Sequence, residues 1–170
     1  LQRQYGNGGI GMLFPYAIPD TYSPPGYTSE MTGEWECGLT RSIPPAVPVG
    51  MMGMACRTSD ALASFTIRFN KTQPERQKRL RILVPRYDSV FTFELAADGE
   101  VRTVEVEPRA NTPQAADEWT ITIDLEKAPR ELIFRPLEGV TPETPFVVHG
   151  FSLENTKPGG VIVDAAGVGA

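Results

Sequence analysis

Four aromatic residues near the start of the chain have the chemistry to contact a ligand: Tyr16, Tyr22, Tyr27 and Trp35. They lie in or beside residues 15–34, a stretch whose prolines predict a long loop. Aromatic rings pack on the apolar faces of sugars, and Asn, Asp, Glu and Arg bind the hydroxyl groups. Each ring is therefore a candidate sugar contact, and the alternative for each is packing of the loop onto the core. Trp119 is a weaker candidate, because alternation puts it on the apolar side of a strand.

The second reactive feature is a pair of cysteines, Cys37 and Cys56. If neighbouring strands bring them together they form a disulfide, which would stabilise the fold by about 3 kcal/mol and would suit an exported protein. Spacing alone does not decide pairing, so two buried thiols are the alternative.

Residues for catalysis or metal binding are few. The only histidine, His149, falls inside a predicted strand, where a structural role is expected rather than that of a base. The chain has no Gly-x-Ser-x-Gly elbow, too few ligands for zinc, and no D-x-D-x-D loop that would indicate structural calcium. The sequence therefore predicts no catalytic residue, no metal-ligating residue and no cofactor. Scattered Asp and Glu side chains leave structural calcium as a minor alternative that no loop spacing indicates.

The elements that position these side chains are predicted to be strands. Apolar and polar residues alternate over 63–69 and 119–125, and Asp98-Gly99 is a hairpin signal between two apolar runs. Further strands are expected at residues 10–14, 35–39, 50–57, 80–84, 90–95, 101–106, 132–134, 146–153 and 161–163. Many short strands without an amphipathic helix predict an all-β protein, an antiparallel two-sheet β-sandwich of jelly-roll type.

Composition sets the remaining limits. The chain has 170 residues with sixteen Gly, sixteen Pro and 41% hydrophobic residues, which predicts one loop-rich globular domain over residues 1–170. The net charge of -5 argues against nucleic acid as a partner. No apolar run is long enough for a membrane span and no signal peptide is visible; because the chain begins at Leu1, we expect a mature or excised piece of a longer product.

Both ends of the chain carry a family resemblance. The opening L-Q-R-Q-Y-G-N-G-G-I-G (1–11), with T-G-E-W (32–35) as a weaker match, is similar to the start of an accessory domain in peptidoglycan O-acetyl esterases and their relatives. The closing G-F-S-L-E-N (150–155), P-G-G-V-I-V-D (158–164) and G-V-G-A (167–170) resemble the stretch by which SGNH (GDSL-type) hydrolases leave that domain and re-enter the catalytic domain at their second motif block. That family usually has an asparagine before the final glycine, where here Gly169 follows Val168 directly.

The resemblance implies a non-catalytic accessory domain of an exported esterase, periplasmic or extracellular, with residues 161–170 leading back to a covalently linked catalytic domain. The G-D-S and D-x-x-H blocks that such hydrolases need are absent from this chain. The implied partner is glycan or peptidoglycan, and an inserted domain predicts that Leu1 and Ala170 lie close together. The alternatives are a protein-interaction or purely structural sandwich and, as a third interpretation, a complete esterase with unusual catalytic residues.

Overall fold

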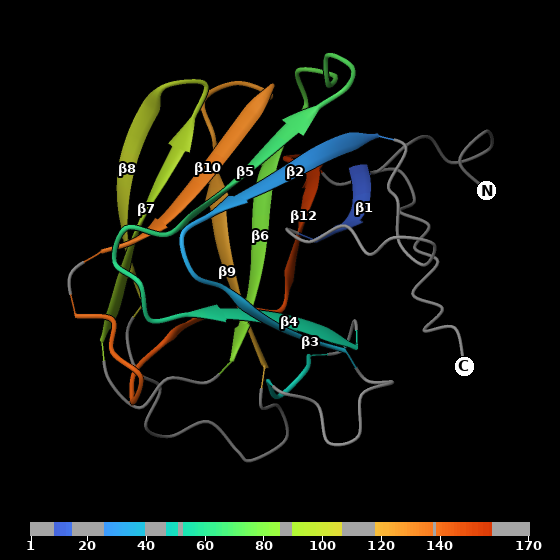
Figure 1. Cartoon of the computed structure of the whole chain (residues 1–170). Coiled ribbons are helices and arrows are strands. Elements are labelled where there is room, and N and C mark those ends of the chain that lie inside the picture. Colours follow the sequence, from blue (N-terminus) through green and yellow to red (C-terminus); the bar gives the residue numbers. More distant parts are fainter. Residues whose placement is uncertain are drawn as a thin grey trace.

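In the computed structural model the structure describes residues 9–14, 26–39, 47–50, 53–85, 90–106, 118–137 and 139–157. Over these residues the chain forms strands and no helix (Figure 1). The strands are β1 (Gly9–Leu13), β2 (Tyr27–Thr32), β3 (Glu36–Leu39), β4 (Met54–Thr58), β5 (Ser64–Phe69), β6 (Gln77–Pro85), β7 (Phe91–Ala97), β8 (Glu100–Val106), β9 (Glu118–Asp124), β10 (Glu131–Pro136), β11 (Phe146–Val148) and β12 (Gly150–Asn155).

Two large antiparallel sheets form a sandwich. One has the strand order β1-β12-β6-β9 and the other the order β2-β5-β10-β7-β8. If β2, β3, β4 and β11 are set aside, the remaining eight strands, counted along the chain, form sheets in the order 1-8-3-6 and 2-7-4-5. That interleaving of early and late strands is the jelly-roll arrangement. The fold class predicted from the sequence is therefore confirmed.

A third, three-stranded sheet adds to the predicted two. Its order is β11-β4-β3, and in Figure 1 β3 and β4 lie across one end of the sandwich. Phe146 of β11 belongs to the same hydrophobic core as Phe65 of β5 and Phe151 of β12. The small sheet thus closes the end of the core and places its own loops beside the sandwich.

Alternation along the strands explains which side chains fill the core. In β5 the rings and branched chains of Phe65, Ile67 and Phe69 are buried, whereas Arg68 is exposed. Phe65 and Phe134 are stacked neighbours in the five-stranded sheet, with centroids 4.4 Å apart. Across the sandwich both rings contact Phe151 of β12, at centroid distances of 6.1 and 5.5 Å. Buried and exposed side chains must alternate in this way in an antiparallel sheet that has one face on the core and the other in solvent.

The hairpin predicted at Asp98-Gly99 joins β7 to β8. Both residues have positive φ, 49° and 86°, as a two-residue turn of the primed type needs. The Asp98 carboxylate also accepts hydrogen bonds from the backbone amides of Arg130 and Glu131, both at 2.9 Å. The turn is thereby tied to the start of β10.

Two sequence predictions are wrong in detail. The prolines predict one loop over residues 15–34, but β2 occupies its second half, because Tyr27 to Thr32 pairs with β5 along its whole length. The apolar run predicts one strand over residues 146–153, but these residues form β11 and β12 in different sheets. The chain changes sheet at His149 and Gly150, where the φ of Gly150 is 148°. His149 is buried and its backbone amide donates to the carbonyl of Leu83 at 2.8 Å.

The expected strand at residues 161–163 lies outside the described residues, as do Leu1 and Ala170.

Candidate functional site

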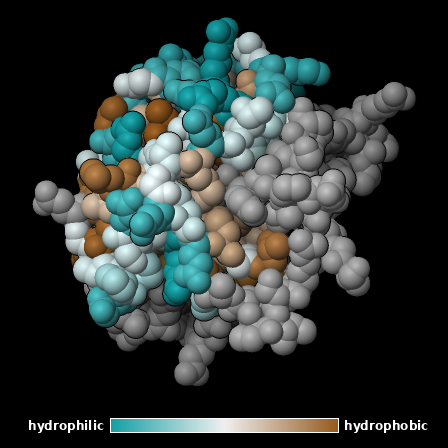
Figure 2. Space-filling model, viewed as in Figure 1, coloured by the Kyte–Doolittle hydropathy of each residue, from teal (hydrophilic) through white to brown (hydrophobic). Residues whose placement is uncertain are grey.

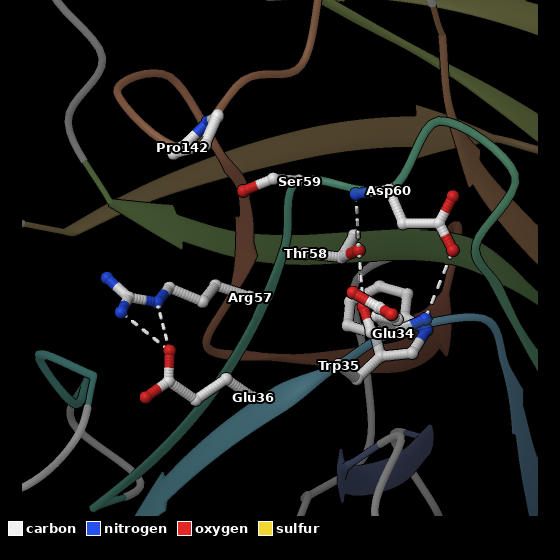
Figure 3. A pocket seen from close by; sticks show the side chains of 8 residues that line it. All are labelled: Glu34, Trp35, Glu36, Arg57, Thr58, Ser59, Asp60 and Pro142. Carbon is white, nitrogen blue, oxygen red and sulfur yellow. Dashed lines mark hydrogen bonds and ion pairs between the residues drawn. The ribbon is translucent and has the colours of Figure 1, made fainter.

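A surface pocket of about 690 Å³ lies where the small sheet meets the sandwich (Figure 3). Its walls come from three segments: residues 34–36 at the start of β3, residues 57–60 at the end of β4, and Pro142 before β11. The lining side chains are those of Glu34, Trp35, Glu36, Arg57, Thr58, Ser59, Asp60 and Pro142. One large aromatic ring among acidic, basic and hydroxyl groups makes a polar site with one apolar wall.

Trp35 joins the pocket to the core. Its ring meets Phe65 and Phe146 edge to face, with centroids 5.7 and 6.2 Å apart. Its indole Nε1–H donates to the carbonyl of Thr32 at 2.9 Å, which fixes the ring's orientation. The ring is only partly buried, so the same side chain packs on the core and lines the pocket.

Asp60 holds one wall of the pocket in place. Its Oδ2 accepts a hydrogen bond from the backbone amide of Glu34 at 3.1 Å, and its Oδ1 accepts one from the amide of Leu62 at 2.8 Å. Gly33 lies against this carboxylate with a φ of 77°, and a Cβ there would be 2.5 Å from Oδ2. A side chain at position 33 would therefore be strained and would displace the Asp60 carboxylate.

Thr58 makes a second connection between the same two loops. Its hydroxyl donates to the carbonyl of Glu34 at 2.6 Å and accepts from the backbone amide of Asp60 at 3.0 Å. Both the amide and the carbonyl of Glu34 are thus bound, so the backbone that carries Glu34 and Trp35 is held from both sides. A pre-organised wall of this kind lowers the entropy cost of binding a ligand.

Arg57 and Glu36 form the far side of the pocket. They are opposed in the register of β4 and β3, and Nε and Nη2 of Arg57 lie 2.7 and 2.6 Å from Oε2 of Glu36. Both side chains are roughly half exposed, at 38% and 49%. The pair therefore presents a guanidinium and a carboxylate to solvent at a fixed position.

The next pair in that register is the disulfide. Cys37 and Cys56 are directly opposed, with Cα atoms 4.1 Å apart, and their sulfur atoms are bonded. Of the two alternatives that the sequence leaves open, the disulfide is confirmed and the pair of free thiols is wrong. The bond fastens β3 to β4 one residue away from the Arg57 and Glu36 pair.

The four aromatic candidates have different positions. Tyr16 and Tyr22 lie outside the described residues. Tyr27 is a correction: it lies in β2 with 3% of its surface exposed, and its hydroxyl donates to the carbonyl of Phe14 at 3.1 Å and accepts from its amide at 2.8 Å. Its ring is part of the core and does not line the pocket, whereas Trp35 does.

Sequence reasoning missed the polar half of the pocket. Glu34, Arg57 and Asp60 were not candidates, although one signal was present. If Cys37 opposes Cys56 in antiparallel strands, their neighbours Glu36 and Arg57 must oppose each other as well. The contact between Asp60 and Glu34 had no such signal, because it joins two loops.

Metal-ligating side chains were expected to be few. Within the described ranges no three His, Cys, Asp or Glu side chains gather in a way that would hold a metal ion. The same residues include no helix with the length and apolar character needed to cross a membrane.

No family model matches the sequence, and no curated protein matches it either. Several solved structures are similar in fold at low sequence identity. The family 32 carbohydrate-binding module of C. perfringens NanJ, solved with galactose, is 16% identical with a TM-score of 0.44, over 75% of this chain and 92% of that one. A mutant of the family 29 carbohydrate-binding module CBM29-2 is 13% identical with a TM-score of 0.45, over 84% of this chain and 89% of that one.

An exo-β-1,3-galactanase of Phanerochaete chrysosporium, solved with galactose, is 12% identical with a TM-score of 0.44 over 78% of this chain. The match spans only 30% of the galactanase. These similarities are too distant to indicate a ligand for this chain.

Proposed function

We propose that this chain is a non-catalytic domain that binds a glycan in the Trp35 pocket. The observation that carries the proposal is the combination of one fixed indole ring with the hydrogen-bonding side chains of Glu34, Arg57 and Ser59 in one cavity. Sugars present apolar C–H faces and ring hydroxyls, which these two kinds of group bind. The volume of about 690 Å³ is within the range of small-ligand sites.

The outer face of the five-stranded sheet is a less suitable sugar site. Ion pairs occupy much of it: Arg68 lies 2.8 Å from Glu30 and 2.7 Å from Glu131, and hydrogen bonds to these carboxylates raise the pKa of Arg68. Figure 2 shows mostly hydrophilic residues on this side, with scattered hydrophobic ones. None of the outward residues described on these strands is aromatic: Thr28, Glu30, Thr32, Ser64, Thr66, Arg68, Thr92, Glu94, Ala96, Val101, Thr103, Glu105, Glu131, Ile133 and Arg135.

We further propose that the domain belongs to an exported SGNH-type esterase and positions glycan, such as peptidoglycan, near a covalently linked catalytic domain. The support is the resemblance at both chain ends and the Cys37–Cys56 disulfide, since disulfides persist in oxidising compartments. Ester hydrolysis by this chain alone is not expected, because the G-D-S and D-x-x-H blocks of that family are absent from its sequence.

Two tryptophan substitutions, one in the pocket and one outside it, test the binding site. Ser59 is exposed and lines the pocket, so Ser59→Trp fills the cavity without touching the core. Thr103 is exposed on the outer face of β8 and serves as the matched control, Thr103→Trp. Titration with a panel of glycans that includes peptidoglycan fragments should show binding by the parent chain and by Thr103→Trp, and loss of binding in Ser59→Trp. Binding that Ser59→Trp leaves unchanged, or a parent chain that binds no glycan, would contradict the proposal.

A further inference from the structure

The charges of the pocket wall are unbalanced. Its charged side chains are three carboxylates, from Glu34, Glu36 and Asp60, and one guanidinium, from Arg57. The pocket therefore carries a net charge of -2 near neutral pH. The other lining residues are uncharged, so the asymmetry is a property of the cavity wall itself.

The three carboxylates differ in what they bind. Both contacts from Arg57 go to Glu36. The two oxygens of Asp60 accept backbone amides. In the described part of the chain the exposed carboxylate of Glu34 makes no hydrogen bond or ion pair, although its backbone is held by Thr58 and Asp60. Glu34 is thus a negative charge on a fixed backbone, with no cation assigned to it among the described residues.

The Trp35 ring, like the carboxylates, favours a positively charged ligand. The face of an indole ring carries negative electrostatic potential and attracts cations more strongly than other aromatic rings do. Trp35 follows Glu34 directly in sequence and lines the same pocket. A ligand ammonium group in the pocket would be attracted by both the Glu34 carboxylate and the Trp35 indole. A ligand carboxylate or sulfate would be repelled by the Glu34 carboxylate.

We propose that the pocket prefers sugar units with a free amino group over the same units with an N-acetyl group or a carboxylate, and that Glu34 determines this preference. The inference rests on the proposed function, because it concerns the ligand of the Trp35 pocket. Acetylation of the amine removes the positive charge and leaves the rest of the sugar unchanged, so it isolates the electrostatic contribution.

The test compares three oligosaccharides of equal length at about pH 6, where such amines are protonated and carboxylates are ionised. They are a glucosamine oligomer, its fully N-acetylated counterpart and an oligogalacturonate. An exposed charge pair predicts roughly fivefold tighter binding of the glucosamine oligomer than of the acetylated one. The oligogalacturonate should bind more weakly than either.

Glu34→Gln keeps the size of the side chain and removes its charge, so it should lower the ratio of the two affinities, glucosamine oligomer over acetylated oligomer, from about fivefold to near one. Glu105→Gln is the matched control: Glu105 lies on the exposed face of β8 and does not line the pocket. It removes the same charge and should leave the preference intact. The inference would be overturned if the parent chain bound both oligomers with equal affinity, or if the two variants lost the preference equally. Neither result would contradict glycan binding in the pocket. Binding of both oligomers that survives Ser59→Trp would instead overturn the proposed function.

Discussion

The carboxylate of Asp60 accepts a hydrogen bond from the backbone amide of Glu34 at 3.1 Å, and so joins two loops that lie 26 residues apart in the chain. The same carboxylate accepts the amide of Leu62 at 2.8 Å. The contact fixes the loop that carries Trp35 to the loop that follows β4, and both loops line the pocket.

Asp60→Ala leaves these two amides without their acceptor. Because each neutral donor contributes modestly and the site is partly exposed, we expect a loss of roughly 1–3 kcal/mol in the free energy of unfolding. Asp60→Asn, which keeps one acceptor oxygen, should lose less. Urea denaturation of the three proteins checks this, and an alanine variant as stable as the parent would contradict the role given to Asp60.

Tyr27→Phe tests whether that ring belongs to the core or to a sugar site. The variant removes the hydroxyl that binds both the amide and the carbonyl of Phe14 and leaves the ring in the core. We expect a loss of about 1–2 kcal/mol of stability with unchanged glycan affinity. Weaker glycan binding by a variant of normal stability would instead place Tyr27 at a sugar site.

The disulfide should contribute to stability through the loop it closes. With a sequence separation of 19 residues, the loop-entropy relation gives about 3 kcal/mol for Cys37–Cys56. The double variant Cys37→Ala with Cys56→Ala should therefore melt well below the parent while it keeps its β-rich circular dichroism spectrum. An unchanged melting temperature would show that β3 and β4 are held by packing alone.

Acid should remove one identifiable contribution to stability. Arg79 donates to both oxygens of Asp124, at 2.8 and 2.9 Å, and this hydrogen bonding lowers the pKa of Asp124 below its ordinary value of 3.8. A carboxyl whose pKa is lower in the folded than in the unfolded state stabilises the fold above the unfolded pKa and stops doing so as pH falls through the folded one. The stability of the parent should thus fall more steeply than that of Asp124→Asn as pH drops below about 4. Parallel stability curves for the two proteins would contradict this.

Much of the sandwich could be predicted from the sequence because burial leaves a period of two. Phe65 and Ile67 alternate with polar residues, and the positive φ of Asp98 and Gly99 follows from the residue types that a tight hairpin needs. β2 was missed because it follows two prolines and its alternation, Tyr27 to Thr32, contains few apolar residues. Its place in the sheet depends on pairing with β5, which local pattern does not show.

The pocket was only partly predictable for the same reason. Trp35 was a candidate by residue type, and the opposition of Glu36 to Arg57 follows once the cysteines are paired. The hydrogen bond from the Glu34 amide to the Asp60 carboxylate depends on how two loops meet at the end of the sandwich. No spacing rule in the sequence predicts that contact.

Glycan bound in the pocket should contact Trp35, and NMR can observe that contact. The chain contains two tryptophans, Trp35 and Trp119, so its NMR spectrum holds two indole N–H signals. Assignment by Trp35→Phe identifies the signal of Trp35, whose indole N–H is bound to the Thr32 carbonyl beside the pocket. Titration with a glycan that the chain binds should shift the Trp35 indole signal and the amides of Glu34 and Asp60 in a saturable way. Saturable binding that leaves these three signals in place would contradict glycan binding in this pocket.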